Sequence, residues 1–174
     1  MRTEAIFFEA PGVVACGEVE IPEPSGDRVL IQTAYSTVSP GTELRSLAGK
    51  QAGTKAWPFI PGNSLSGAVV AAGPDSTVKI GAKVYCSGTK AACVELLWGG
   101  NAGYAITSSA DVYEVPVATS LLDLSFAHIA AIALRGVQLS QVKPGERVAI
   151  IGLGLYRPTF GAAFRLGRRG GEGV

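Results

Sequence analysis

Few residues in this 174-residue chain belong to the types that usually carry metal or nucleophilic chemistry, and they lie far apart. The single histidine, His128, falls in a segment with helical periodicity. An imidazole titrates near neutral pH, so a metal or proton-transfer role is open. Because no cysteine or second histidine stands at helical spacing from it, we interpret His128 as a packing or surface residue.

The three cysteines, Cys16, Cys86 and Cys93, are odd in number and widely spaced. This pattern does not predict a disulfide framework, and it fits a reducing compartment. No histidine and acid arrangement is recognisable around them. We therefore predict that they are small buried hydrophobic residues and not nucleophiles.

The first 120 residues consist of short extended segments separated by glycine and proline. Any functional site in this region must therefore be positioned by strands and the loops between them. The predicted strands cover residues 5–9, 13–21, 28–35, 66–72, 84–86, 104–107 and 112–115. Within the third of these, one face carries Val29, Ile31, Thr33 and Tyr35. No helical stripe of convincing length interrupts them, so the pattern predicts a mainly β fold.

The periodicity changes after residue 120. Ser120 and Asp123 have the spacing of a helix capping box, with aspartate in place of the usual glutamate. Apolar residues then recur at steps of three and four, at Phe126, Ile129, Ala133 and Val137. This spacing predicts a helix. After a turn at residues 142–146, the apolar run 147–153 is rich in β-branched residues and predicts a buried parallel strand.

Composition limits the class of protein. The chain has 47% hydrophobic and 17% charged residues, a mean hydropathy of +0.29 and a formal net charge of +1, which predicts a globular protein. Near-neutral charge argues against a specific nucleic-acid partner or an anionic membrane surface. No apolar run approaches the roughly 18 residues of a membrane span, and Glu4 and Glu9 interrupt the start where a signal peptide would be apolar. We expect a cytoplasmic protein.

Five stretches in a fixed order resemble the medium-chain dehydrogenase/reductase superfamily, in which a GroES-like substrate domain precedes a Rossmann domain. They are Thr37–Glu43 (TVSPGTE), Phe59–Val70 (FIPGNSLSGAVV), the V-K-x-G turns at 78–84 and 142–148, Gly99–Tyr104 (GGNAGY) and Val148–Gly154 (VAIIGLG). The first stretch is similar to zinc-lacking branches that include bacteriochlorophyllide dehydrogenase-like proteins. The resemblance implies a GroES-like β-barrel over residues 1–120, then the first helix and strand of an incomplete Rossmann α/β domain over 121–155.

Zinc-dependent members of the superfamily place a cysteine in the first motif and a Gly-His-Glu in the second, which bind a zinc ion that polarises the substrate oxygen. Here these positions carry Ser39, Asn63 and Ser64. A neutral hydroxyl or amide does not replace thiolate or imidazole as a zinc ligand at useful affinity. The family's four-cysteine structural zinc lobe is also missing. The resemblance therefore implies that no metal is bound.

Without a metal, hydride transfer needs hydrogen-bond donors for the oxyanion that develops on the substrate. Ser39 and Asn63 inherit the metal-ligand positions, so the resemblance implies that they line the cleft as catalytic donors. The alternative is that both are loop-capping polar residues. Three aromatic residues are either pocket walls or core: Tyr35, Trp57 and Trp98. We expect Glu43 to close a hydrogen bond or ion pair and not to act as a general base.

The resemblance implies NAD or NADP as cofactor in a complete enzyme, with Gly152, Leu153 and Gly154 in the phosphate-binding turn. The third glycine of that motif is replaced by Arg157, and Pro158 follows. Residues 156–174 form an atypical Gly/Arg-rich tail whose only acidic residue is Glu172, and no second strand is recognisable that would place an acid against a ribose. We expect binding of the cofactor by this chain alone to fail. A frameshift near codon 155 that truncates a longer enzyme is one explanation, and a short product with its own function is the other.

The sequence thus predicts a zinc-independent NAD(P)-dependent oxidoreductase, truncated and inactive as an isolated chain, whose substrate is a small carbonyl or alcohol. The alternative from another class is a noncatalytic GroES-like binding or oligomerisation domain. A zinc-free quinone reductase differs only in substrate, which sequence does not identify. The apolar strand 148–155 without its sheet partners predicts aggregation or docking against another chain, and a homodimer is open.

Overall fold

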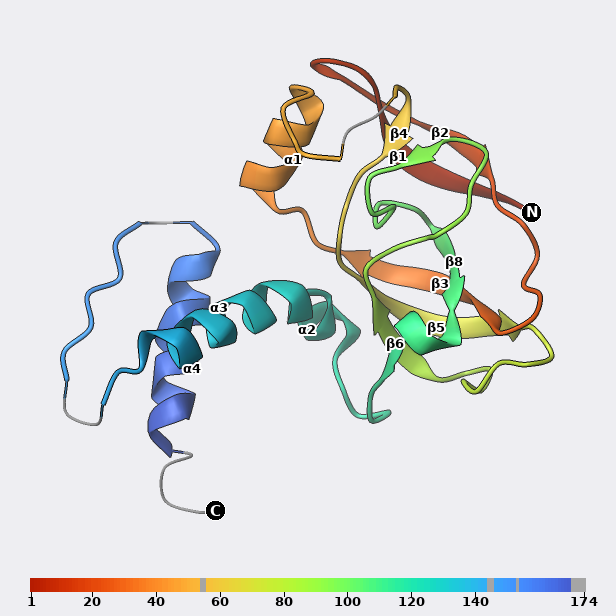
Figure 1. The fold of residues 1–174 in the computed structure, drawn as a ribbon. Helices are drawn as coiled ribbons and strands as arrows, with labels where there is room; N and C mark the ends of the chain where they lie inside the picture. Colours follow the sequence, from red (N-terminus) through yellow and green to blue (C-terminus); the bar gives the residue numbers. More distant parts are fainter. Residues whose placement is uncertain (54–55, 144–145, 153, 170–174) are drawn as a thin grey trace. The chain divides into compact units, whose positions relative to one another are not determined.

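The computed structural model of the chain describes residues 1–53, 56–143, 146–152 and 154–169 (Figure 1). The chain divides into two compact units, Met1–Ser125 and Phe126–Val174. Among the described residues, no helix is both long and apolar enough to cross a membrane.

Two β-sheets make up most of the first unit (Figure 1). One has the order β2 (Val13–Glu20), β1 (Arg2–Ala10), β4 (Phe59–Ile60), β7 (Glu95–Leu96). The other has the order β8 (Tyr104–Ser108), β3 (Arg28–Ser36), β5 (Leu65–Ala72), β6 (Lys83–Cys86), β9 (Tyr113–Glu114). A short segment connects them, because Ala102 forms a bridge with Ala5 of β1 and the Gly103 carbonyl accepts a hydrogen bond from Thr33 of β3 at 2.9 Å. The mainly β prediction is confirmed.

The strand β3 lies inside its sheet, between β8 and β5, and it is buried on both faces at its start. Val29 and Ile31 pack with Leu65 of β5 in one core cluster, as the alternation predicts. Leu30 is also buried, against Ile21 in a second cluster on the opposite face. Burial therefore does not alternate along the strand: three successive residues are buried at its start, and from Gln32 onward every residue is exposed except the half-buried Thr33.

A helix that the sequence pattern did not predict, α1 (Pro40–Leu47), follows β3. Pro40 occupies its first turn, where a missing amide hydrogen and a fixed φ are tolerated. The helix has eight residues. This is too short to show a convincing apolar stripe, and the Pro40-Gly41 pair at its start is more typical of a turn.

The predicted helix after residue 120 is two helices, α2 (Leu121–Ser125) and α3 (Ala127–Ser140). The amide of Asp123 donates to Oγ of Ser120 at 3.3 Å, which confirms the predicted N-terminal cap. Phe126 separates the helices, and the first unit ends just before it. A short 3-10 helix, Ser109–Asp111, precedes β9 in that unit.

The second unit contains α3 and α4 (Tyr156–Arg169), which pack against each other. At the contact, a Cβ added to Gly136 would lie 2.6 Å from Cε1 of Phe160, so the glycine allows the close approach. Of the predicted stripe, Ile129 and Ala133 are buried, whereas Phe126 is 41% exposed; Ala163 of α4 is also buried. Tyr156–Arg169, most of the predicted atypical tail, is helical, and Pro158 is accommodated in its first turn.

The predicted parallel strand at residues 147–153 is wrong for the part of it that the structure describes. Residues 146–152 have no regular secondary structure, and Ile151 is 98% exposed. Leu153 lies outside the described residues. A parallel strand is stable only between neighbouring strands, and the described part of the second unit contains none.

Candidate functional site

Ser39 lies between β3 and α1, immediately before the first turn of the helix. Its backbone is extended (φ −96°, ψ 95°), and its carbonyl accepts a hydrogen bond from the amide of Glu43 at 2.9 Å. The side chain makes no capping hydrogen bond. The hydroxyl instead donates to Oγ1 of Thr42 at 3.4 Å, a long contact, and the residue is buried. The Ser39 hydroxyl is thus only weakly engaged.

Asn63 stands in the loop between β4 and β5, directly after Gly62, whose φ is +92°. Its side chain is half-buried, and it makes no hydrogen bond with any residue that the structure describes. An amide carries two N–H donors and one carbonyl acceptor. Asn63 therefore keeps its donors free for a ligand.

The structure brings the segments that carry Ser39 and Asn63 next to each other. The amide of Thr37 donates to the carbonyl of Ser64 at 3.0 Å, and Ser36 pairs with Leu65 in the register of β3 and β5. Ser39 is two residues beyond Thr37, and Asn63 immediately precedes Ser64. Both predicted residues therefore stand at the same end of the five-stranded sheet.

Next to these two residues, side-chain hydroxyl groups of the sheet and its loops form hydrogen bonds with backbone carbonyls of α2. Oγ1 of Thr37 and Oγ of Ser64 both donate to the carbonyl of Ser125, at 2.8 and 2.5 Å. Oγ of Ser66 donates to the carbonyl of Leu121 at 2.5 Å. Because its hydroxyl proton is engaged with the end of α2, Ser64 has a structural role here.

A buried acid and a buried amide adjoin the same loops. Nδ2 of Asn101 donates to Oε2 of Glu43 at 3.1 Å, and both residues are buried, at 6% and 8% exposure. Burial raises the pKa of Glu43, while hydrogen bonds from Asn101 and from the Ser39 backbone lower it by less. The expected hydrogen bond of Glu43 is confirmed, with a partner 58 positions away in the sequence.

Two glycines allow this arrangement. The amide of Gly100 donates to the carbonyl of Gly62 at 2.7 Å, and the amide of Asn101 donates to the carbonyl of Pro61 at 3.0 Å. A Cβ on Gly62 would lie 2.5 Å from Oδ1 of Asn101, and one on Gly100 would lie 2.7 Å from the Gly62 carbonyl carbon. Any other residue at either position would separate the Asn101 loop from the Asn63 loop.

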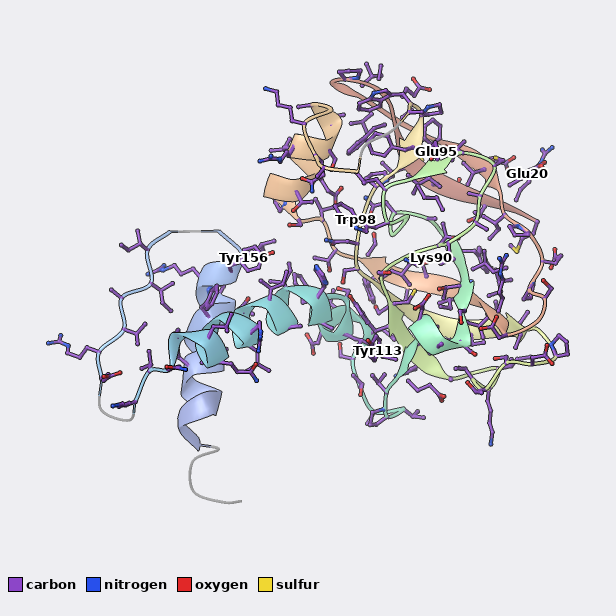
Figure 2. All side chains as sticks on the ribbon, in the orientation of Figure 1. Glu20, Lys90, Glu95, Trp98, Tyr113 and Tyr156 are labelled. Carbon is purple, nitrogen blue, oxygen red and sulfur yellow. The ribbon has the colours of Figure 1, made fainter. Side chains whose placement is uncertain are left out.

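The predicted aromatic residues divide between core and surface. Trp57 and Trp98 pack against the core cluster of Phe8 and Phe59, which supports the core interpretation (Figure 2 labels Trp98). Tyr35 is 47% exposed. It borders an open hollow of about 300 Å³ that is lined by parts of β1, β2 and β3 and by residues 101–103.

The cysteines are only partly as predicted. Cys86 is buried, and burial raises the pKa of its thiol to about 11. Cys16 and Cys93 are exposed, so the prediction of burial is wrong for both. Each lies on or beside the edge strand β2: Cys16 belongs to it, and Sγ of Cys93 accepts a hydrogen bond from the amide of Glu20 at 3.2 Å. Burial on one face of an edge strand is hard to predict from isolated short segments.

Residues 10–117 match the family described as the alcohol dehydrogenase GroES-like domain, and this match covers more than half of the chain. The chain belongs to this family. It is thereby a member of the medium-chain dehydrogenase/reductase superfamily, and that prediction is confirmed.

Three proteins that are similar to the chain have names that describe dehydrogenases. The chain is 28% identical, over 51% of its length and 29% of the relative's, to 2-desacetyl-2-hydroxyethyl bacteriochlorophyllide A dehydrogenase of Cereibacter sphaeroides. It is 24% identical, over 88% of its length and 51% of the relative's, to the zinc-type alcohol dehydrogenase-like protein YdjJ of Escherichia coli K12. An Escherichia coli CFT073 short chain alcohol dehydrogenase, solved with NADH, is similar in fold, with a TM-score of 0.75 and 18% identity over 91% of this chain and 52% of that one. The chain spans about half the length of these proteins or less.

The donor set at the family's zinc positions does not fit a zinc ion. Ser39 and Asn63 offer neutral oxygen and nitrogen atoms, and the hydroxyl proton of Ser64 is held by Ser125. Cys86, a buried thiol with a raised pKa, favours the protonated form and not the thiolate that a metal needs.

The residues expected to hold the cofactor fit that role only in part. Gly152 has a φ of +122°, and α4 begins two residues after Gly154 with a turn in which the Arg157 amide donates to the Gly154 carbonyl at 3.1 Å. Leu153, the third predicted cofactor residue, lies outside the described residues, and the strand that should precede the motif is not formed in residues 146–152. Arg157 and Pro158 line a hollow of about 380 Å³ beside that segment. The described residues of this segment therefore match the expected phosphate-binding turn in the positions of Gly152 and Gly154 and in the helix that follows.

Sequence reasoning missed the polar partner Asn101 and the serine and threonine contacts to α2. Asn101 was part of a recognised motif, Gly99–Tyr104, but its side chain has a function only once Glu43 is brought opposite it. The one available signal was the flanking pair of glycines, which indicates a close backbone approach. Nothing in the spacing of Thr37, Ser64 and Ser125 indicates that they meet.

Proposed function

We propose that this chain is the substrate-side part of a zinc-independent, NAD(P)-dependent oxidoreductase that acts on a small carbonyl or alcohol. Membership of an oxidoreductase family supports the class of reaction. The observation that carries the zinc-independent part is the donor set: Asn63 keeps a free amide and Ser39 a weakly engaged hydroxyl at the positions where zinc-dependent relatives have metal ligands.

In this proposal the chain's residues act on the substrate oxygen. The N–H donors of Asn63 and the O–H of Ser39 donate hydrogen bonds to a carbonyl oxygen as negative charge develops on it. The cofactor, held in a complete enzyme, supplies the hydride. Glu43 is not a general base here, because its carboxyl group is buried against Asn101 and is not free to reach a ligand.

The proposal includes a longer parent enzyme, since the relatives are about twice as long as the chain or longer and the cofactor segment is incomplete. Sequencing the source gene from about codon 145 and translating all three frames beyond Leu155 tests this. A frame that supplies the missing glycine and a long open Rossmann pattern is the expected result. A confirmed stop after Val174, with no continuing frame, contradicts it.

Activity of that longer product tests the site. The double variant Ser39→Ala with Asn63→Ala should lose roughly 10²-fold or more in kcat, because oxyanion donors act mainly in the transition state. Ser140→Ala, which removes an exposed hydroxyl on α3, is the matched control and should leave kcat unchanged. Unchanged turnover in the double variant removes both residues from the site.

Metal content tests the zinc-independent part separately. Plasma emission spectroscopy on the purified chain, expressed with added zinc, should find far less than one zinc per chain. A value near one per chain overturns it. This measurement needs neither substrate nor cofactor, so it separates the metal question from the catalytic one.

A noncatalytic binding or oligomerisation domain is a second candidate, and the exposed apolar side chains of the second unit favour it. The most exposed of them are Ile151, Leu139, Leu134 and Ile132. NADH and NADPH fluorescence titrations of the longer product separate the two candidates, since only the oxidoreductase should shift or quench the nucleotide signal. Sedimentation of this chain tests for a homodimer.

A further inference from the structure

Glu43 is unusual among the described carboxylates because it is buried. It lies on α1, and its side-chain partner Asn101 comes from the segment that connects the two sheets. Nδ2 of Asn101 donates to Oε2 of Glu43 at 3.1 Å. This one bond uses one oxygen of the carboxyl group and one end of the amide.

The other two oxygens of the same pair are buried and have no partner in the described structure: Oε1 of Glu43 and Oδ1 of Asn101. If Glu43 is ionised, Oδ1 of Asn101 is a buried acceptor without a donor, which costs about 1–3 kcal/mol, and only the hydrogen bonds from Asn101 and from the Ser39 backbone offset the burial of the negative charge. A single proton on Oε1 changes this, because the hydroxyl of a carboxylic acid can donate to the amide oxygen. An acid and a primary amide then exchange one hydrogen bond in each direction.

Among the described residues, no charged side chain acts on the pKa of Glu43, which is raised by burial and lowered by the hydrogen bonds from Asn101 and the Ser39 backbone. On α1 the other ionisable side chain is Arg45, which is exposed and donates to the carbonyl of Lys50 at 3.1 Å. The segments Pro61–Asn63 and Gly99–Gly103 have no ionisable side chain. Burial is the largest influence on the Glu43 pKa and raises it from its ordinary value of 4.5.

The acid and amide join the two segments that carry the candidate site. Glu43 belongs to the helical turn that Ser39 begins, through a backbone hydrogen bond of 2.9 Å. Asn101 is held to the loop before Asn63, through its amide to Pro61 and through the contact of its Oδ1 with Gly62. A bond between the two side chains therefore sets the separation of the two segments.

We propose that Glu43 is protonated in the folded protein at neutral pH, that it and Asn101 donate one hydrogen bond to each other, and that this pair positions Ser39 and Asn63. The positioning role rests on the proposed function, whereas the shared proton does not. Both residues act through others and touch no substrate. The tests below use the chain itself, with no substrate or cofactor, so their failure is distinct from failure of the proposed activity.

The first test compares wild type with Glu43→Gln in urea unfolding from pH 4.5 to pH 8.5. A glutamine amide donates to Asn101 at every pH. The stabilisation from a protonated Glu43 is complete below pH 4.5 and is lost as the pH rises through the raised folded-state pKa. The urea midpoint of wild type should therefore fall relative to that of Glu43→Gln as the pH rises. Glu95→Gln, at the exposed Glu95 labelled in Figure 2, is the matched control and should follow wild type. A constant difference between wild type and Glu43→Gln overturns the proposal.

A second measurement is made on the wild-type protein, so it does not depend on how a variant folds. Carbon-13 NMR of the glutamate side-chain carboxyl groups in wild type should show one resonance that is still in its protonated position at pH 7. Its loss in Glu43→Asp assigns it. If all glutamate carboxyl resonances are ionised at pH 7, Glu43 carries no proton and the proposal fails.

The positioning role has its own readout, the side-chain and backbone amide resonances of Asn63. Glu43→Ala should shift them, Glu43→Gln should restore them, and in wild type they should follow the titration of Glu43. In Glu43→Gln this pH profile should be absent. Asn63 resonances that are unchanged in Glu43→Ala, or a pH profile that persists in Glu43→Gln, contradict the positioning role.

Discussion

The two units of the chain differ in how many of their apolar side chains are buried. In the first, apolar strand residues lie in several buried clusters, and Val29, Ile31 and Leu65 are fully buried. In the second, the described apolar residues that are buried are Ile129 and Ala133 of α3 and Ala163 of α4. Ile151, in a segment just as apolar as β3, is 98% exposed.

The difference shows that an apolar β-branched run becomes a strand only where partners exist. β3 has β8 on one side and β5 on the other, so its backbone has a partner strand at each edge, and both of its faces are covered at its start. Residues 146–152 have no strand beside them in the described part of their unit. The preference of a residue for strands reflects how well its side chain packs on a partly buried sheet. It does not produce a strand where no neighbouring strand is present.

The largest expected effect comes from truncating one apolar side chain in each region. Leu65→Ala should lower the free energy of unfolding by about 2–5 kcal/mol, because it leaves a cavity in a closed core. Ile151→Ala should change it by no more than about 0.5 kcal/mol, because the side chain is already in water. Urea unfolding followed by far-ultraviolet circular dichroism checks both variants. Equal losses would show that the second unit buries Ile151 in solution.

Glycine substitution sharpens the same comparison at the backbone. Gly62→Ala should destabilise the first unit by roughly 2–4 kcal/mol, since its φ is +92° and the new methyl group would lie 2.5 Å from Oδ1 of Asn101. Gly152 also has a positive φ, +122°, but nothing lies within 4 Å of an added Cβ.

For Gly152→Ala we expect a loss below about 1 kcal/mol, because its segment can relax without moving a packed neighbour. Tryptophan fluorescence reports the first unit, where both Trp57 and Trp98 lie, and circular dichroism reports the helices of the second. A Gly62→Ala variant as stable as wild type would mean that the contact between the Gly62 and Asn101 loops is not required.

Removing one buried and one exposed hydroxyl group should change the free energy of unfolding by smaller amounts. Thr37→Val removes a buried hydrogen bond to the Ser125 carbonyl and should cost about 1 kcal/mol, since Ser64 still donates to the same oxygen. Ser140→Ala removes a bond to the Val137 carbonyl on the exposed end of α3 and should cost less than about 0.5 kcal/mol. Hydrogen exchange at α2 should become faster in Thr37→Val alone. Equal exchange in both variants would show that the hydroxyl does not fasten α2.

The fold of the first unit was predictable because its strands are separated by clear turn residues and alternate in polarity. Positions of Ser39 and Asn63 followed from motifs, and the structure places their segments together through Thr37 and Ser64. The short helix α1 was not predictable, since eight residues beginning with Pro40-Gly41 carry too little periodicity.

The sequence could not show which distant segments contact each other. It also could not show that the apolar residues 147–152 lack neighbouring strands in the described part of their unit. The bond from Asn101 to Glu43 spans 58 positions and depends on a close approach of two loops. The strand at residues 147–153 was predicted from its composition alone, which says nothing of whether a neighbour is present to pair with it. The helix α4 forms in spite of Pro158 because proline is tolerated in a first turn and Phe160 finds Gly136.

The smallest effect concerns the cysteines and separates the interior of the first unit from its surface. At pH 8, a thiol whose pKa is about 11 is ionised in only about one molecule in a thousand, and Cys86 is also buried. Cys16 and Cys93 are exposed. Iodoacetamide at pH 8, followed by peptide mass spectrometry, should therefore modify Cys16 and Cys93 first and Cys86 only after urea is added. Rapid modification of Cys86 without urea would mean that the core around it opens readily, and the contrast between a closed first unit and an open second one would not hold.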